Sequence, residues 1–324
     1  MRILYVVRYV GIISGGHRWM FSQCNELAKL GHDVAVWSYM GDADGAVFFP
    51  LAVPRLNDAT AFLRHTDAVI FTEWSLAQIV AGLVGPRKHY LVQMRDDLIY
   101  PEGQQRRRAA KSYDLPLHCI TIAHWLREFL AAEHGHRDVP LVSPWINPET
   151  FYPDPAWPRG ERFRVLIEGP EHVLSKNLAD AHTAVAGLPV EVWGFNADTE
   201  PTFRYHYDRF VVAAPPAGVR RIMGCCDVML KTSRYEGRPG TVVEAMACGL
   251  PVVATDFLGT DDLIHEHNCL LVPYGDVVGA RAAVERLMKE PDLRRYLSEN
   301  GLRYVREHLT VERNLPLFLA ALGV

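Results

Sequence analysis

The most constraining feature of this sequence is a loop, a short helix and a strand compressed into residues 233–255, SRYEGRPGTVVEAMACGLPVVAT. Two glycines and a proline within 234–240 exclude regular structure there. A helix is predicted at 241–248, because Gly249 is a residue that ends helices. Residues 252–254, Val-Val-Ala, are typical of a short buried strand. Loop, helix and strand in so few residues predict the corner of an α/β sheet.

The predicted helix start is suited to an anion. Thr241 is expected to cap the helix, and Gly240 joins it directly to the loop. The free N–H groups and the dipole at a helix N-terminus attract negative charge. We therefore predict that Gly240 and Thr241 contact an anionic group of a ligand.

Two carboxylates, Glu236 in the loop and Glu244 in the helix, are separated by seven residues. An acid beside a phosphate-binding helix end would repel the phosphate, so both are predicted to accept hydrogen bonds from hydroxyls. The acid of a dinucleotide-binding fold accepts from ribose in this way. The alternative is that both are surface acids that favour the helix dipole.

This string, with EG, PG, EAMACG and LPVV in order, resembles the E-x7-E segment of retaining GT-B glycosyltransferases of family 4, and the resemblance covers nearly the whole chain. It implies that Glu236 touches the donor sugar and that Glu244 holds the nucleotide ribose. It also implies an α/β fold of two doubly wound, Rossmann-like domains that face each other across a cleft. The nucleotide sugar is expected mainly on the C-terminal domain and the acceptor on the N-terminal domain.

Length and composition agree with two soluble globular domains. The chain has 324 residues, 49% of them hydrophobic and 22% charged. Residues 141–153, LVSPWINPETFYP, have the proline content of a linker. We predict domains at 1–147 and 148–324, with a last helix at 314–322 that crosses back to the first domain. A net charge of −4 does not favour nucleic-acid binding.

The chain is predicted to be cytoplasmic. It has no apolar run long enough to span a bilayer, and its first residues do not have the form of a signal peptide. Its six cysteines form no C-x-x-C pair, as expected of buried, reduced thiols. A basic run, Arg106 to Arg108 with Lys111, is interpreted as a solvated helix face; the alternative is contact with an anionic acceptor or a membrane surface.

The N-terminal domain is predicted to open with a βαβ unit whose first turn is rich in glycine. A strand at 2–7 leads into this turn, and a helix is expected at 17–30. The spacing is not G-x-G-x-x-G, so dinucleotide binding is not favoured. The family resemblance implies that Gly15 and Gly16 approach the donor phosphate or the acceptor; the alternative is a plain tight turn.

Polar residues follow two further predicted strands, at 68–71 and 90–93, where ligands bind in parallel sheets. The passage from the second of these strands to residue 130 resembles a family-4 branch that includes rhamnosyltransferases. Met94 and Arg95 replace an Asp and a Tyr of that branch, whereas Asp96 falls on its Glu. The resemblance implies a catalytic role for Asp96.

The C-terminal domain carries one match and one departure in its phosphate-binding residues. Family 4 has a Gly-Arg after the first strand and a later Lys, both of which grip the donor diphosphate. Lys176 matches the Lys, but Pro170 stands in place of the Arg. Our hypothesis is that Arg238, or Arg234, supplies the lost charge from the loop. The alternative is that Arg238 points to solvent and that Lys176 with the helix end suffices.

No metal site or cofactor is predicted. Asp42 and Asp44 form a D-x-D sequence, but they lie among small residues where Asp and Gly make turns. Two His-x-His pairs have no carboxylate or cysteine at ligand spacing. These histidines are His134, His136, His265 and His267. The substrate is expected to be a UDP-, GDP- or dTDP-sugar.

The predicted activity is transfer of a hexosyl-type sugar from a nucleotide-diphospho-sugar to an acceptor hydroxyl, with retention of configuration. The acceptor is a glycan, a lipid-linked molecule or a small molecule, in the synthesis of a polysaccharide, glycolipid or glycosylated natural product. Two alternatives stay open: a GT-B epimerase-like enzyme, and a non-catalytic subunit that binds nucleotide sugars. Dependence on an added acceptor separates transferase from epimerase, and slow hydrolysis of a nucleotide sugar separates enzyme from binder.

Overall fold

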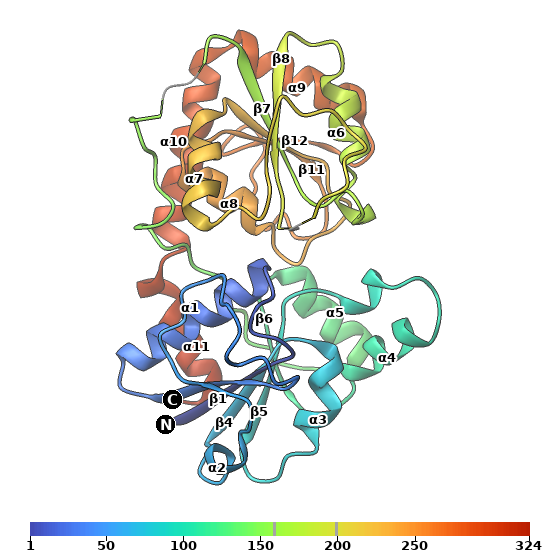
Figure 1. Ribbon diagram of the computed structural model, residues 1–324. Helices are drawn as coiled ribbons and strands as arrows, with labels where there is room; N and C mark the ends of the chain where they lie inside the picture. Colours follow the sequence, from blue (N-terminus) through green and yellow to red (C-terminus); the bar gives the residue numbers. More distant parts are fainter. Residues whose placement is uncertain (158–159, 198–199) are drawn as a thin grey trace. The chain divides into compact units, whose positions relative to one another are not determined.

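The computed structural model describes residues 1–157, 160–197 and 200–324. The chain divides into two compact units, each with its own sheet (Figure 1). The N-terminal unit comprises Met1–Pro144 and Asn314–Val324, and the C-terminal unit comprises Trp145–Arg313. Most of the last helix, α11 (Val311–Leu322), belongs to the N-terminal unit, where Phe318 packs on Trp19 of α1.

The N-terminal unit contains a six-stranded parallel sheet in the order β3-β2-β1-β4-β5-β6. The central strands β1 and β4 are rich in apolar residues and buried on both faces, as is typical of parallel sheets. The strands are β1 (Arg2–Val7), β2 (Asp33–Ser38), β3 (Arg55–Leu56), β4 (Ala68–Phe71), β5 (Arg87–Val92) and β6 (His118–Thr121). The helices are α1 (Gly15–Lys29), α2 (Thr60–Leu63), α3 (Ala77–Ala81), α4 (Gln104–Ser112) and α5 (His124–His134), with 3-10 turns η1 (Trp74–Leu76) and η2 (Asp96–Ile99).

The C-terminal unit contains a second six-stranded parallel sheet, in the order β12-β11-β10-β7-β8-β9. The strands are β7 (Phe163–Glu168), β8 (Val190–Phe195), β9 (Arg209–Val211), β10 (Val228–Lys231), β11 (Val252–Asp256) and β12 (Leu270–Pro273). The helices are α6 (Leu178–Val185), α7 (Pro216–Cys225), α8 (Gly240–Ala247), α9 (Val277–Lys289) and α10 (Pro291–His308), with a 3-10 turn η3 (Leu174–Lys176).

Helices cover both faces of the C-terminal sheet. On one face α7, α8 and α10 enclose a core with the strands, and on the other face α6 and α9 pack together (Figure 1). Both sheets have the strand order 3-2-1-4-5-6 when the strands of each unit are counted separately. In this doubly wound order, strands are added toward one edge of the sheet from the first strand and toward the other edge from the fourth. The switch point therefore lies between the first and fourth strands, and ligands bind outside their carboxyl ends. In the C-terminal unit these strands are β7 and β10.

The corner at 233–255 forms as predicted, except for its helix cap. Gly249 has φ +69° and ends α8, because the N–H of Gly249 donates to Met246 O and that of Leu250 to Ala245 O, a Schellman motif. The prediction that Thr241 caps this helix was wrong. Pro239 occupies the cap, and Thr241 lies inside the first turn.

The glycine-rich turn of the N-terminal unit is partly helical. Gly15 and Gly16 are the first residues of α1, which begins two residues before the predicted start. Ser14 caps this helix, and its Oγ accepts from the His17 N–H at 3.1 Å. A β-carbon on Gly16 would lie 3.1 Å from Gln93 Nε2, whereas Gly15 has open space around it. Gly16 therefore permits a close approach of Gln93, and Gly15 leaves the helix start uncovered.

Candidate functional site

A buried ion pair lies at the carboxyl ends of β7 and β10. Leu230 is paired with Ile167 across these neighbouring strands, so the next residues, Lys231 and Glu168, lie side by side. Lys231 Nζ donates to Glu168 Oε2 at 2.5 Å. The Lys231 side chain is 2% exposed and that of Glu168 10%. A charged pair therefore occupies the position at which a doubly wound sheet binds ligands.

Glu236 extends this pair into a cluster of four alternating charges. Lys176 Nζ donates to Glu236 Oε1 at 2.9 Å and to Oε2 at 3.1 Å, and Lys231 Nζ lies 3.1 Å from Oε1. The Ser233 hydroxyl donates to the same Oε1 at 2.8 Å. We call Glu168, Lys176, Lys231 and Glu236 the charge cluster. Its formal charges sum to zero, so burial leaves no uncompensated ion.

The loop that carries Glu236 is fixed on both sides by the backbone. The Arg234 N–H donates to Ser175 O at 2.8 Å, and the Glu236 N–H donates to Leu258 O at 2.9 Å. Gly259 has φ +104°, and a β-carbon there would lie 2.5 Å from Glu236 O. Only glycine fits at 259, and it allows the following segment to close over the loop.

A glycine, Gly169, also leaves the space that the Lys176 side chain occupies. Gly169 follows β7 directly and has φ +135°, and a β-carbon there would meet Lys176 Cγ at 3.1 Å. The stem of Lys176 therefore lies against the bare backbone of Gly169 and reaches Glu236 from η3. The sequence places Pro170 next to this glycine, where family 4 has its Arg.

The cluster keeps its carboxylates ionised. Burial raises the pKa of Glu236, but Lys231 and Lys176, with the hydrogen bonds from Lys176 and Ser233, lower it to about 2. Burial likewise opposes ionisation of Glu168, and Lys231 with Lys176 holds its pKa below the ordinary value. Burial lowers the pKa of Lys176, yet Glu168 and Glu236 raise it overall. All of these shifts favour the charged forms at neutral pH.

The start of α8 reaches this cluster through Thr241. Its hydroxyl donates to Glu168 Oε2 at 2.9 Å, so the first turn of the helix lies beside the four charges. Gly240 precedes it as the first residue of the helix. The predicted anion-binding residues Gly240, Thr241 and Lys176 thus gather at one end of the sheet, together with Glu236.

Glu244 lies further along α8 and is 2% exposed, while Glu236 is 8% exposed. The alternative that both are solvated surface acids was therefore wrong. A buried carboxylate needs donors, and Glu236 finds them within the charge cluster.

Arg238 is held by a buried carboxylate. Its Nε donates to Asp262 Oδ2 at 2.5 Å, its Nη2 pairs with Oδ1, and the two side chains are 6% and 1% exposed. The Tyr304 hydroxyl donates to the same carboxylate at 2.7 Å. The alternative that Arg238 points to solvent was wrong. A contact between Arg238 and phosphate stays a prediction, with the constraint that two guanidinium nitrogens already bind Asp262.

The remaining predicted residue, Asp96, lies in the N-terminal unit at the start of η2. Its Oδ2 accepts from the Trp74 N–H and the Tyr90 hydroxyl, each at 3.4 Å, and its own N–H donates to the Tyr113 hydroxyl oxygen at 2.9 Å. Burial raises the pKa of Asp96 to about 7, against the lowering effect of the first two bonds. Glu73 adds to the rise by like-charge repulsion. The pKa of this carboxyl group therefore lies near neutral pH.

The D-x-D carboxylates have structural partners. Asp42 accepts from the Val10 N–H at 3.0 Å and from the Ser38 hydroxyl, and Asp44 accepts from the Asn57 amide at 3.0 Å. Among the residues that the structure describes, no three His, Cys, Asp or Glu side chains are grouped to hold a metal ion. All six cysteines are free thiols.

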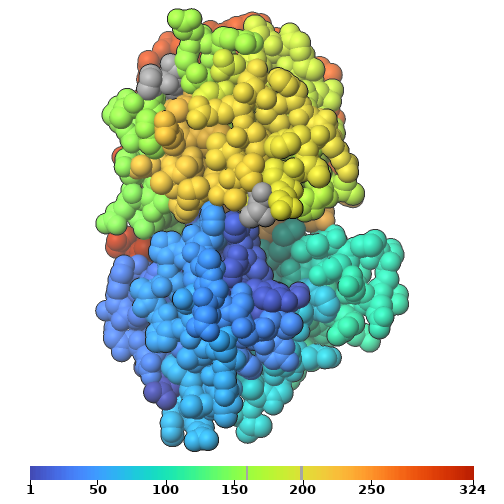
Figure 2. All heavy atoms as spheres, in the orientation of Figure 1, coloured from blue at the N-terminus to red at the C-terminus, as the bar shows by residue number. Residues whose placement is uncertain are grey.

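The basic run lies on α4, which projects from the surface of the N-terminal unit (Figure 2). Arg107, Arg108 and Lys111 are exposed, and Arg106 pairs with Glu102 at 2.8 Å. This arrangement agrees with a solvated helix face. Within residues 1–157, 160–197 and 200–324, no helix has the length and apolar character needed to span a membrane.

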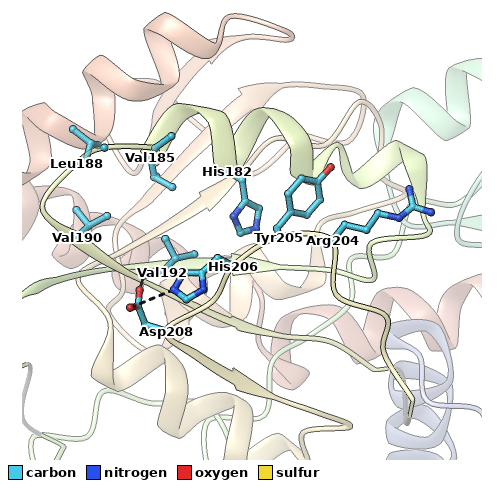
Figure 3. A pocket seen from close by; sticks show the side chains of 11 residues that line it. His182, Val185, Leu188, Val190, Val192, Arg204, Tyr205, His206 and Asp208 are labelled. Carbon is cyan, nitrogen blue, oxygen red and sulfur yellow. Dashed lines mark hydrogen bonds and ion pairs between the residues drawn. The ribbon is translucent and has the colours of Figure 1, made fainter.

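The C-terminal unit has a surface cavity of about 470 Å³ (Figure 3), and none of its lining residues belongs to the charge cluster. Its walls come from the end of α6, from Val190 and Val192 of β8, and from residues 204–206 with Asp208, where His206 Nε2 lies 3.7 Å from Asp208 Oδ1. Val190 is the first residue of β8, at the amino end of its strand. Since doubly wound sheets bind ligands at the opposite ends, we do not assign the donor to this cavity.

Glu168 was not predicted as a site residue, and Lys231 was predicted only as part of a polar strand end, residues 231–233, that faces the nucleotide. Each is the charged last residue of an otherwise apolar strand segment, LIE and VMLK. A single charged residue at the end of an apolar strand is the sequence pattern from which both residues could have been predicted.

The segment that forms the charge cluster also matches a known family. Residues 156–290 match the family model described as "Glycosyl transferases group 1", a segment that contains the whole charge cluster. The chain is 29% identical over 107 residues to N-acetyl-alpha-D-glucosaminyl L-malate synthase of Bacillus anthracis, a match that covers 33% of this chain. The matched segment spans 28% of the length of that curated relative.

Solved structures match nearly the whole chain, and two of them illustrate the likeness. The sucrose-phosphate synthase of Thermosynechococcus elongatus superposes with a TM-score of 0.80 at 16% identity, over 98% of this chain and 97% of its own. Anabaena Alr3699/HepE, solved in complex with UDP and glucose, superposes with a TM-score of 0.77 at 14% identity, over 100% and 99%. These likenesses and the two doubly wound sheets confirm the predicted α/β fold of the GT-B type.

Proposed function

We propose that this protein is a glycosyltransferase of the group 1 type that uses a nucleotide-diphospho-sugar as donor. One observation carries the proposal: an ionised carboxylate, Glu236, is held by Lys176 at the carboxyl ends of the central strands, beside the first turn of α8. The segment with this arrangement is the one that matches the group 1 family model. A cation, a helix start and a carboxylate are the three groups that a phosphorylated sugar needs.

The donor is proposed to lie along α8. Glu244 accepts from the ribose hydroxyls, Gly240 and Thr241 with Lys176 receive the diphosphate, and Glu236 accepts from a hydroxyl of the sugar. Negative charge develops on the diphosphate as the glycosidic bond breaks, so fixed cations and N–H donors stabilise the transition state more than the ground state. The complex of the HepE structure with UDP and glucose supports a nucleotide sugar as the donor class.

The acceptor side is proposed to belong to the N-terminal unit. Asp96, whose pKa is raised to about 7 by burial, is suited to take a proton from an acceptor hydroxyl. The first turn of α1, with the open surface at Gly15, is the second predicted contact in that unit. A glycan, a lipid-linked molecule or a small molecule each offers such a hydroxyl.

Finer points of the prediction belong to this proposal and need separate tests. They are retention of configuration, a hexosyl-type donor, a rhamnosyltransferase-like specificity, activity without a metal ion, and a cytoplasmic location. The product anomer by NMR decides retention, and activity in EDTA decides metal independence. Comparing dTDP-rhamnose with UDP-glucose decides the branch.

The decisive experiment begins with a thermal-shift panel of UDP-, GDP- and dTDP-sugars. A ligand at a hundred times its dissociation constant stabilises the protein by about 2.7 kcal/mol. The best donor is then incubated with and without candidate acceptors, with Glu236→Gln as the matched inactive control. Release of nucleoside diphosphate that increases with acceptor is the expected result. Binding without release by the wild type would indicate a binding subunit, and sugar isomerisation without acceptor would indicate an epimerase.

A further inference from the structure

The two lysines of the charge cluster differ in their access to solvent. The Lys176 side chain is 20% exposed, whereas that of Lys231 is 2% exposed. Lys176 donates to both carboxylate oxygens of Glu236, whereas Lys231 forms an ion pair with Oε1; among the described contacts, Oε2 accepts from Lys176 only. A ligand that arrives from solvent can therefore meet Lys176 but not Lys231.

Lys231 is fixed in place from several sides. It is the last residue of β10 and is paired in register with Ala254 of β11. Its ammonium group lies 2.5 Å from Glu168 Oε2 and 3.1 Å from Glu236 Oε1. Thr241 in turn donates to Glu168 Oε2. If Lys231 moved away, two buried carboxylates would lose a cation, so its position is stable.

We propose that Lys231 is the permanent counter-charge of Glu236, positioned by Glu168, and that Lys176 turns from Glu236 to the diphosphate when a donor binds. The first part concerns the protein alone. The second part rests on the proposed function, because it requires a nucleoside diphosphate. Lys231 is then a positioning residue, since it acts on the ligand only through Glu236.

The charges explain why both lysines are needed. Before binding, Glu236 has Lys176 from η3 and Lys231 from β10 as cations, Ser233 as a neutral donor, and the like charge of Glu168 on β7. A diphosphate adds negative charge beside the same carboxylate and competes for Lys176. With Lys231 in place Glu236 stays an ionised acceptor for a sugar hydroxyl. Without Lys231, the carboxylate would gain a proton and lose that role.

The test is a carbon-13 NMR titration of the Glu236 carboxyl group, assigned by its loss in Glu236→Gln and recorded with and without UDP. In the wild type we expect the carboxylate to stay ionised down to about pH 4 in both conditions. In Lys231→Met with UDP, its titration midpoint should lie at least about one pH unit higher than in the wild type. Lys231→Arg should restore the wild-type curve. Lys289→Met, which removes an exposed lysine of the same unit, should not move it.

A second variant protects the test against misfolding. Lys231→Met leaves Glu168 with a buried negative charge, so the double variant Glu168→Gln with Lys231→Met is titrated as well, because it removes both charges of the pair. Its titration midpoint with UDP should lie above that of Glu168→Gln alone, which lacks the same like charge. Equal midpoints in the folded double variant and in Glu168→Gln would overturn the counter-charge role.

The result can be separated from the proposed function. If the wild type binds UDP and transfers no sugar, the proposed function fails, while the titration still decides the role of Lys231. If none of UDP, GDP and dTDP binds, the turning of Lys176 is overturned, and the titration without nucleotide decides the rest. In an active enzyme, the acid limb of the kcat profile of Lys231→Met should lie at least about one pH unit above that of the wild type. An acid limb at the same pH as in the wild type would assign Lys231 a purely structural part and overturn the proposal.

Discussion

Replacing Arg238 with alanine is expected to destabilise the C-terminal unit by about 3–5 kcal/mol, the cost of breaking a buried ion pair from one side. Arg238 and Asp262 are both buried and joined by two hydrogen bonds, one of them 2.5 Å long. Alanine would leave the Asp262 carboxylate in the interior with the Tyr304 hydroxyl, at 2.7 Å, as a neutral donor. A neutral hydroxyl does not replace a guanidinium.

The loss can be measured by calorimetry without ligand. For a unit of this size, each kcal/mol shifts Tm by about 2–4 °C, so the transition of the C-terminal unit should fall by about 6–20 °C. Arg234→Ala is the matched control, because Arg234 is exposed, and it should change stability by less than about 0.5 kcal/mol. Asp262→Asn added to Arg238→Ala should recover part of the loss, since it removes the unpaired charge. A fall of less than about 3 °C for Arg238→Ala would refute the reasoning.

The same variant decides whether Arg238 also binds phosphate. Kinetics are measured at a temperature at which both proteins are fully folded. A contact with the leaving diphosphate would make Arg238→Ala slower by about 30- to 1,000-fold, or about 2–4 kcal/mol of transition-state stabilisation. A loss under about threefold would remove Arg238 from the phosphate site and leave it the partner of Asp262 alone.

Three further variants test the donor and acceptor assignments. Glu244→Ala should lose one or two hydrogen bonds to ribose, each worth about 1.5–3 kcal/mol, so an unchanged UDP affinity by calorimetry would contradict its role. Glu236→Gln should lower turnover and leave UDP affinity nearly intact; an equal loss of both would assign it to the nucleotide instead. The pKa of Asp96 is raised from 3.8 to about 7 on folding, so the folded protein binds more protons in this range and its free energy of unfolding falls as pH rises from about 4 to 7. Urea unfolding of Asp96→Asn should lack that slope, and an identical slope in both proteins would show that Asp96 is not its source.

Local patterns predicted much of the fold. The predicted strand at 68–71 coincides with β4, and the run at 252–254 lies within β11, because parallel strands buried on both faces are nearly continuous in apolar residues. Gly249 ends α8 as predicted, since a positive φ is a local requirement that glycine meets. These features depend on neighbours in sequence.

Predictions that depended on distant partners failed or stayed open. Thr241 has the side chain of a cap, but its hydroxyl donates to Glu168, 73 residues earlier in the chain. Arg238 reads as a loop cation available to a ligand, yet Asp262 lies against it. Helix capping and exposure to solvent are local tendencies of a side chain. They are outweighed when a residue distant in sequence offers an opposite charge or a hydrogen-bond acceptor that needs a donor.

The pairing of Glu168 with Lys231 shows what strand order adds to such patterns. Two strands, β8 and β9, separate them in sequence, and only the order β10-β7 makes them neighbours. A doubly wound domain with the strand order 3-2-1-4-5-6 places its first and fourth strands side by side, so their last residues should be compared whenever that fold is predicted.

The N-terminal unit offers the contrast. Its equivalent strands, β1 and β4, end in Val7 and Phe71, with Val6 opposite Phe71. The first charged pair there, Arg8 with Glu73, lies beyond the strands, at 3.9 Å and with Arg8 44% exposed. Solvent screens such a pair, and it exerts little force on a ligand. Of the two switch points, the one in the C-terminal unit therefore has the buried fixed charges that a diphosphate requires, which is the physical reason for assigning the donor to that unit.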